Sequence, residues 1–109
     1  MRIAVTSQNF RTVTGHAGKT RRFLVYEAET GIEPVEVKRL DLPKEMSIHE
    51  TPNGAMHPLD AMDVVVTESC GLGFPRKMAM RGVTVFVTEE SNPVAAVMAA
   101  LLDNPPPIH

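Results

Sequence analysis

The 109-residue chain is short of several residue types, and each shortage excludes a class of protein. It has one cysteine and no tryptophan, so an internal disulfide is impossible and a reducing, cytoplasmic setting is expected. No apolar run reaches the roughly 18 residues that a membrane-spanning helix requires, and the first residues lack a secretory leader pattern. A formal net charge of −2 argues against nucleic-acid binding through bulk charge. We therefore expect a small cytoplasmic domain with neither membrane nor nucleic acid as a partner.

Acidic residues are missing from one long stretch of the chain. Residues 2–26 contain no carboxylate, whereas most of the 13 acids lie between residues 27 and 68. The acid-free stretch carries the bases Arg2, Arg11, Lys19, Arg21 and Arg22. If it folds as one unit, its loop presents a positive field to a nearby anion. A basic loop can equally serve solubility alone, so both interpretations stay open.

Alternation of apolar and polar side chains predicts three strands in the first half, over residues 2–7, 22–28 and 32–42. A polar loop separates the first two strands, and the Thr30-Gly31 turn joins the second and third. The three should form an antiparallel meander. Pro34 cannot donate a ladder hydrogen bond, so the third strand is expected at a sheet edge.

The second half predicts alternating strands and helices after a long loop. Residues 43–62 are rich in proline and turn residues, which indicates a loop with at most a brief helix. Residues 63–67 and 83–87 are β-branched runs typical of buried strands. Residues 75–81 and 94–102 predict helices, the first with a proline at its start and Gly82 past its end.

This order of elements predicts an α/β fold. A right-handed crossover should make the last two strands parallel neighbours, which gives a mixed five-stranded sheet of the ribonuclease-H-like kind, in the order β-β-β-(α)-β-α-β-α. Residues 1–104 are expected to form a single domain of cofactor-binding type, and residues 105–109 a proline-rich C-terminal tail.

Two common chemistries are excluded by missing residues. A ribonuclease-H-type nuclease needs clustered carboxylates to hold its metal ions, and the first two predicted strands provide none before Glu27. The sequence also lacks a Walker-type Gly-x-x-x-x-Gly-Lys-Ser/Thr loop, so nucleotide hydrolysis has no support.

The turn between Glu68 and Pro75 follows a buried strand, the place where open α/β sheets bind ligands. Gly71 and Gly73 let the backbone approach a ligand, and free amides at a helix start favour anions. Cys70 in that setting is expected to have a lowered thiol pKa, which would make it a better nucleophile or metal ligand. Alternatively, the turn simply needs glycines and Cys70 is a small hydrophobic residue.

The spacing from Cys70 to Arg76 also fits the Cys-x5-Arg phosphate cradle of cysteine-dependent phosphatases. Pro75 removes one amide from such a cradle, and neither serine nor threonine follows the arginine. This remains a minor alternative.

Four histidines complete the set of candidate ligands. His16 lies in the basic, acid-free loop, where a cationic neighbourhood favours the neutral imidazole that binds metals. His49 and His57 flank the Pro52-Asn53-Gly54 turn, too far apart for a local chelate. His109 ends the proline-rich tail and looks incidental. The methionines are interpreted as core residues that fill gaps.

Short segments spread over residues 1–104 resemble one known family, the dinitrogenase iron–molybdenum cofactor-binding domains. The segments are residues 3–7, the His16-Ala17-Gly18 loop leading to residues 23–26, residues 63–66, the Gly71-Leu72-Gly73 turn, residues 82–86 and the closing apolar helix. The family loop usually has an aromatic where Ala17 stands, and a small residue is more usual in place of Cys70. The family has a ribonuclease-H-like fold, in agreement with the order of elements.

The resemblance implies a carrier rather than an enzyme: a domain that binds iron–molybdenum cofactor or a related metal–sulfur cluster and passes it on during nitrogenase assembly. Such clusters are usually anionic and favour soft or imidazole ligands. The expected metal ligands are His16 and Cys70, with His57 or His49 closing the site. Charge balance is expected from the basic loop and the glycine turn, through Gly18, Lys19, Arg21, Gly71 and Gly73.

Partners are then expected among metallocofactor-assembly or nitrogenase-related proteins, with the chain itself a monomer or weak dimer. A regulatory or interaction domain that keeps the fold without a ligand remains the main alternative. In that case His16 and Cys70 would be dispensable.

Overall fold

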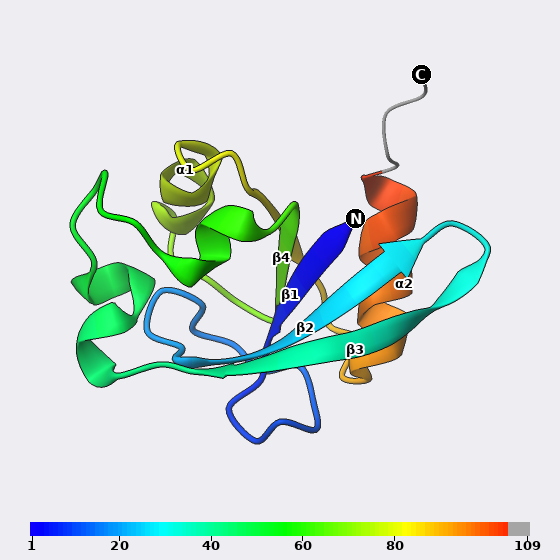
Figure 1. Ribbon diagram of the computed structural model, residues 1–109. Coiled ribbons are helices and arrows are strands. Elements are labelled where there is room, and N and C mark those ends of the chain that lie inside the picture. Colours follow the sequence, from blue (N-terminus) through cyan, green and yellow to red (C-terminus); the bar gives the residue numbers. More distant parts are fainter. Residues whose placement is uncertain (105–109) are drawn as a thin grey trace.

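The computed structural model describes residues 1–104 (Figure 1). The predicted proline-rich tail at residues 105–109, with His109, lies outside the described residues. Five strands form one sheet in the order β3-β2-β1-β4-β5. The strands are β1 (Arg2–Thr6), β2 (Arg22–Glu29), β3 (Ile32–Asp41), β4 (Val64–Thr67) and β5 (Thr84–Val87). The α-helices are α1 (Phe74–Ala79) and α2 (Pro93–Asp103).

The sheet is mixed, as the sequence predicts. β1 pairs antiparallel with β2, and β2 antiparallel with β3, which confirms the meander. β1 pairs parallel with β4, and β4 parallel with β5. β3 lies at an edge, as Pro34 indicates.

The prediction that residues 83–87 form a buried strand is wrong. β5 is the opposite edge of the sheet, with β4 as its one strand neighbour, and the side chain of Val87 at its end is 53% exposed. A β-branched run favours strand structure whatever the number of neighbours. β4 does fit the prediction, because all of its side chains are buried.

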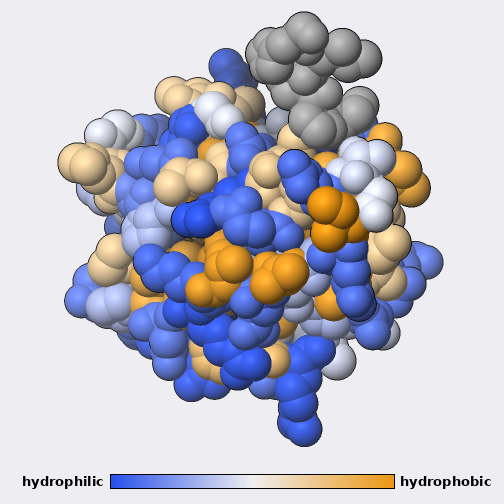
Figure 2. Space-filling model, turned by 45° about the vertical axis from the view of Figure 1, so that its right-hand side comes forward, coloured by the Kyte–Doolittle hydropathy of each residue, from blue (hydrophilic) through white to orange (hydrophobic). Residues whose placement is uncertain are grey.

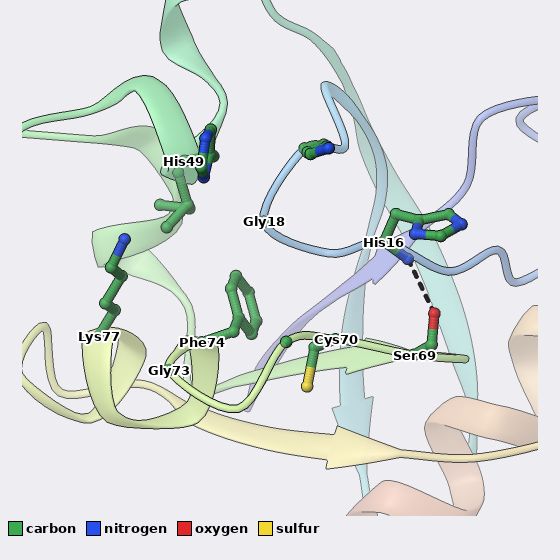
Figure 3. Close-up of a pocket in the computed structure, with 11 residues that line it drawn as sticks. His16, Gly18, His49, Ser69, Cys70, Gly73, Phe74 and Lys77 are labelled. Atoms are coloured by element: carbon green, nitrogen blue, oxygen red, sulfur yellow. Dashed lines mark hydrogen bonds between the residues drawn. The ribbon is translucent and has the colours of Figure 1, made fainter.

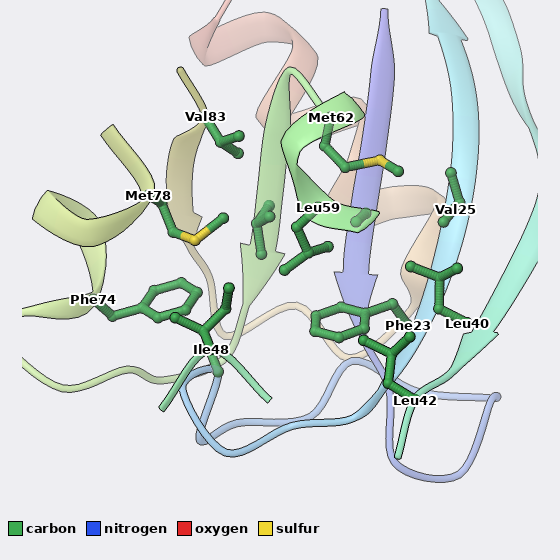
Figure 4. Packing of buried hydrophobic residues seen from close by; sticks show 13 residues of the cluster. Phe23, Val25, Leu40, Leu42, Ile48, Leu59, Met62, Phe74, Met78 and Val83 are labelled. Carbon is green, nitrogen blue, oxygen red and sulfur yellow. The ribbon is translucent and has the colours of Figure 1, made fainter. Parts of the chain in front are cut away.

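Both faces of the sheet are covered. In β1, Ala4 belongs to the core cluster on one face, while Ile3 and Val5 belong to the cluster on the other, as the alternation of a strand requires. α2 covers the second face. The first face is covered by α1 and by residues 43–62, whose apolar side chains pack on Phe23 (Figure 4). The two layers fix where the loops at the ends of β1 and β4 emerge.

Residues 43–62 form the expected long connection, stiffened by three short 3-10 helices: η1 (Lys44–Met46), η2 (Ile48–Glu50) and η3 (Pro58–Ala61). Ile48 and Leu59 anchor the connection in the core and are fully or almost fully buried. The connection therefore has a defined path with few backbone ladder bonds of its own, so its position depends on side-chain contacts.

The two α-helices begin and end close to the predicted residues. α1 begins at Phe74, one residue before Pro75, and the chain turns out of it at Gly82, whose φ of +76° is easiest for glycine. α2 begins after Asn92, whose side chain accepts a 3.0 Å hydrogen bond from the amide of Ala95. No helix within residues 1–104 is both long and apolar enough to cross a membrane.

Hydrophobic residues also reach the surface on the side of α2 and the β2–β3 hairpin (Figure 2). A groove of about 400 Å³ lies between the hairpin turn and α2, lined by Ile32, Met98, Leu101 and Leu102 together with Glu29 and Glu33. The hairpin turn lies at the end of the sheet opposite to the carboxyl ends of β1 and β4.

Candidate functional site

A pocket of about 550 Å³ opens beyond the carboxyl ends of β1 and β4 (Figure 3). Three segments far apart in the sequence build its walls: the loop between β1 and β2, the η2 turn, and the β4–α1 turn together with α1. Its lining residues are His16, Gly18, Lys19, Ile48, His49, Ser69, Cys70, Gly71, Gly73, Phe74 and Lys77. This is the sheet end at which α/β proteins commonly bind ligands.

The β1–β2 loop is attached to the β4–α1 turn through Ser69. The hydroxyl oxygen of Ser69 accepts a 3.0 Å hydrogen bond from the amide of His16, and its carbonyl accepts one of 3.1 Å from Ala17. A Cβ atom on Gly15 would lie 2.3 Å from the Ser69 hydroxyl oxygen. Glycine at position 15 therefore permits the close approach of the β1–β2 loop to Ser69, the residue before Cys70.

His16 adopts a left-handed backbone conformation, with φ of +56°. The conformation is held by the bonds that its carbonyl accepts from the amides of Lys19 and Thr20, at 2.9 and 3.0 Å. Non-glycine residues with positive φ are uncommon, and such backbone strain gathers at functional sites. The residue with this uncommon conformation is one of those that line the pocket.

A buried hydroxyl network fixes the strand ends beneath the pocket. The Thr6 hydroxyl at the end of β1 donates to the Thr67 hydroxyl at the end of β4 over 2.9 Å. Thr67 in turn donates to the carbonyl of Ser69 over 3.0 Å. The turn that carries Cys70 is thus tied to both central strands.

The η2 wall is joined to the β1–β2 loop by a backbone hydrogen bond. The amide of His49 donates to the carbonyl of Gly18 over 2.7 Å, and the neighbouring Ile48 side chain is 2% exposed. His49 and His16 consequently line the same pocket, although neither lies on a strand or α-helix.

The lining carries cationic and neutral donor groups but no carboxylate. Lys19 and Lys77 supply two ammonium groups, and the histidines supply two imidazoles. An anion in this pocket would meet positive charge without a competing acid on the walls. The prediction of an anion-attracting loop is consistent with this arrangement.

Cys70 lines the pocket, but the predicted lowering of its thiol pKa is wrong. Burial raises the pKa of the Cys70 thiol above its ordinary value, because the ionised form loses hydration. Its sulfur points toward β5 in Figure 3, and the residue packs against the core cluster that includes Val83 and, at its margin, Val85. The thiol is neutral at physiological pH, contrary to what a nucleophile needs.

Two of the predicted site residues lie away from the pocket. Arg21 is exposed and does not line it. His57 is 6% exposed, and both of its ring nitrogens are engaged: Nδ1 accepts from the amide of Leu59 at 3.0 Å, and Nε2 lies 2.6 Å from the carbonyl oxygen of Met46. We therefore leave Arg21 and His57 out of the site. Arg76 of the Cys-x5-Arg spacing does not line it either.

Comparison with known proteins assigns the family. The family model described as "Dinitrogenase iron-molybdenum cofactor" matches residues 1–104. The chain belongs to this family. No curated protein gives a significant match.

Two solved structures share the fold with this member of the dinitrogenase iron–molybdenum cofactor family. The crystal structure of PH0822 matches with a TM-score of 0.64 at 20% identity, over 100% of this chain and 96% of that one. An NMR structure of a putative NifB protein from Thermotoga, described as belonging to the DUF35 family, matches with a TM-score of 0.56 at 14% identity. That match covers 94% of this chain and 88% of the other.

The family assignment raises the question of what the walls of this pocket can bind. Within residues 1–104, no three histidine, cysteine, aspartate or glutamate residues are placed to hold one metal ion.

Four pocket residues were not predicted from the sequence: Ile48, Ser69, Phe74 and Lys77. Lys77 lies one helical turn after Phe74 on α1, and this i, i+3 spacing would have placed both on one face. Ser69 gives no such signal, since its role depends on the tertiary approach of the β1–β2 loop.

Proposed function

We propose that this domain is a carrier, not an enzyme, that transiently binds an anionic iron–molybdenum or related metal–sulfur cluster and hands it on during metallocofactor assembly. The observation that carries the proposal is the pocket itself: two histidines, one cysteine and two lysines are among its lining residues, and no aspartate or glutamate is. The family assignment points to nitrogenase cofactor handling and to nitrogenase-related partners.

The chemistry of the donors supports temporary binding. Iron–sulfur clusters that are held permanently commonly use four cysteine thiolates, and this chain has one cysteine. Imidazoles from His16 and His49 are suitable ligands for iron. Lys19, Lys77 and the backbone at Gly71 and Gly73 would balance the cluster's negative charge. A cluster held in this way can leave without the breaking of several thiolate bonds.

Cys70 can act as a metal ligand in this proposal only after its side chain turns and its thiol ionises. To bind a metal, its sulfur would have to turn from the core toward the pocket and lose its proton, and burial opposes ionisation. We assign it as a ligand that forms its bond after the cluster has entered. The same burial, with Arg76 outside the lining, removes support for a phosphatase.

Three finer assignments complete the proposal. The sheet and its helices are assigned to the ribonuclease-H-like type, the setting is cytoplasmic, and the carrier is a monomer or weak dimer. The fold type rests on the family and the order of elements, and the cytoplasmic setting rests on the single cysteine. A ligand-free interaction domain would share these three properties but would bind no cluster in the pocket.

Anaerobic gel filtration of the protein with extracted iron–molybdenum cofactor tests the proposal. We expect molybdenum and iron to elute with the protein at near-stoichiometric level. A His16→Ala, His49→Ala double variant should lose most of both metals, whereas Lys38→Ala, an exposed change on β3, should keep them. Metals that elute only with the small molecules would contradict the proposal for this cofactor.

A further inference from the structure

The wall of the pocket that carries His49 is held in place mainly by contacts outside the pocket. η1, η2 and η3 are each three or four residues long, and turns connect them. Short 3-10 helices have few internal bonds and poor bond geometry. Some other contact must therefore fix the distance between His49 and the α1 wall that carries Lys77.

His57 provides a contact of this kind. Its Nδ1 accepts the hydrogen bond from Leu59, so the neutral ring carries its proton on Nε2 and donates to the Met46 carbonyl over 2.6 Å. Met46 ends η1 and lies three residues before His49. One buried side chain thus joins η3 to the start of the His49 wall.

The η3 end of this contact is tied in turn to α1. The amide of His57 donates to a carboxylate oxygen of Asp60 over 2.9 Å, which completes a capping box. The other Asp60 oxygen accepts from Arg81, just past α1, over 2.9 Å. Arg81, 10% exposed, also donates to the carbonyls of Ala55 and Pro52. The hydrogen bonds lead without a break from the end of α1 to the His49 wall.

We propose that His57 is a positioning residue that fixes the His49 wall against the pocket through its Nε2–H bond to the Met46 carbonyl, with Asp60 and Arg81 as its anchor on α1. Its effect on cargo binding rests on the proposed function, whereas its effect on the wall does not. The buried histidine expected to be a ligand thus acts through His49 without contact with the cargo.

Two substitutions separate the two bonds of the ring. In His57→Asn the amide oxygen can take the place of Nδ1 and keep the cap on η3, but the side chain is too short to reach Met46. In His57→Gln the amide nitrogen can take the place of Nε2 and keep the bond to Met46, while the cap is weakened. The pair therefore tests the Met46 bond separately from the cap.

The first measurement is hydrogen exchange of the His49 amide by NMR, because this amide donates to Gly18 across the two walls. We expect the His49 amide to exchange about three- to tenfold faster in His57→Asn, because one hydrogen bond is lost. In His57→Gln the exchange rate should stay near that of the wild type. A purely structural cap would give the reverse order. His57→Ser, also a good cap that cannot reach Met46, gives the same comparison if His57→Asn fails to fold.

The second measurement is binding of isolated iron–molybdenum cofactor under anaerobic conditions. Affinity should fall about fivefold in His57→Asn and stay near wild type in His57→Gln. Unchanged His49 exchange in both His57→Asn and His57→Ser would overturn the positioning role. If wild-type protein binds no cofactor while the exchange order holds, the proposed cargo is wrong and the positioning role stands.

Discussion

The amide of His49 donates to the carbonyl of Gly18 over 2.7 Å, and this bond couples two histidines that lie far apart in the sequence. Gly18 belongs to the same tight loop as His16, whose carbonyl accepts from two following amides. Any movement of the long connection between β3 and β4 should therefore reach the loop of His16. The pocket walls that carry His16 and His49 are thus joined by a direct backbone hydrogen bond.

The close approach of Gly15 to Ser69 predicts a loss of stability in Gly15→Ala. The new methyl group would force the Ser69 hydroxyl to rotate and give up its bond to the His16 amide. We expect the free energy of unfolding in urea to fall by about 1–2 kcal/mol. Gly71→Ala is the matched control, since no atom lies within 4 Å of its Cβ position. An equal effect of the two substitutions would contradict the role of Gly15.

The carboxylate-free lining predicts that each pocket lysine strengthens cargo binding. Lys19→Ala or Lys77→Ala should weaken the affinity for iron–molybdenum cofactor by roughly three- to tenfold, since a charge-assisted contact is lost. The effect should shrink at high salt because part of the attraction is screened. Titration at two ionic strengths measures both, with Lys38→Ala on β3 as the control of equal charge change. A similar loss in the control would indicate bulk charge and not the pocket.

Local patterns in the sequence were sufficient to predict most of the fold. Alternation in β2, the β-branched run in β4 and the proline that begins α2 are local signals, and each element lies close to its predicted range. β5 lies at the edge of the sheet because it pairs with β4 alone among the described strands. A β-branched run carries no information on how many strands pair with it, so the prediction of a buried strand was wrong.

The candidate site was predicted only in part, because tertiary contacts bring its residues together. His16 and Cys70 come together because β1 and β4 are parallel neighbours whose carboxyl ends adjoin. His49 reaches the pocket because Ile48 packs in the core, and Lys77 reaches it because of the rotation of α1 about its axis. The pKa of Cys70 and the two bonds of His57 depend on burial, which spacing in the sequence does not determine.

The raised pKa of the Cys70 thiol predicts slow alkylation near neutral pH. Only the thiolate reacts, so the rate with iodoacetamide should be below that of a free cysteine in the same buffer at pH 7–8. The rate should rise with a midpoint above the ordinary thiol pKa. The same shift stabilises the fold below that ordinary value, and this contribution is lost as pH rises through the folded-state pKa. A midpoint below that of the free thiol would contradict burial as the cause.

The lowered pKa of His57 predicts that acid destabilises the wall of the pocket. Burial is the main cause, and the Arg81 charge acts in the same direction, while the Met46 carbonyl and Asp60 act against both. The unfolded chain takes up a proton near its ordinary pKa of 6.5, whereas the folded ring resists it. The contribution is therefore fully present above that pH and is lost as pH falls from it toward the folded-state pKa. Urea unfolding at pH 7.5 and 5.5 measures the loss, which should be smaller in His57→Asn because asparagine does not titrate. An equal loss in the two proteins would place the acid sensitivity elsewhere in the chain.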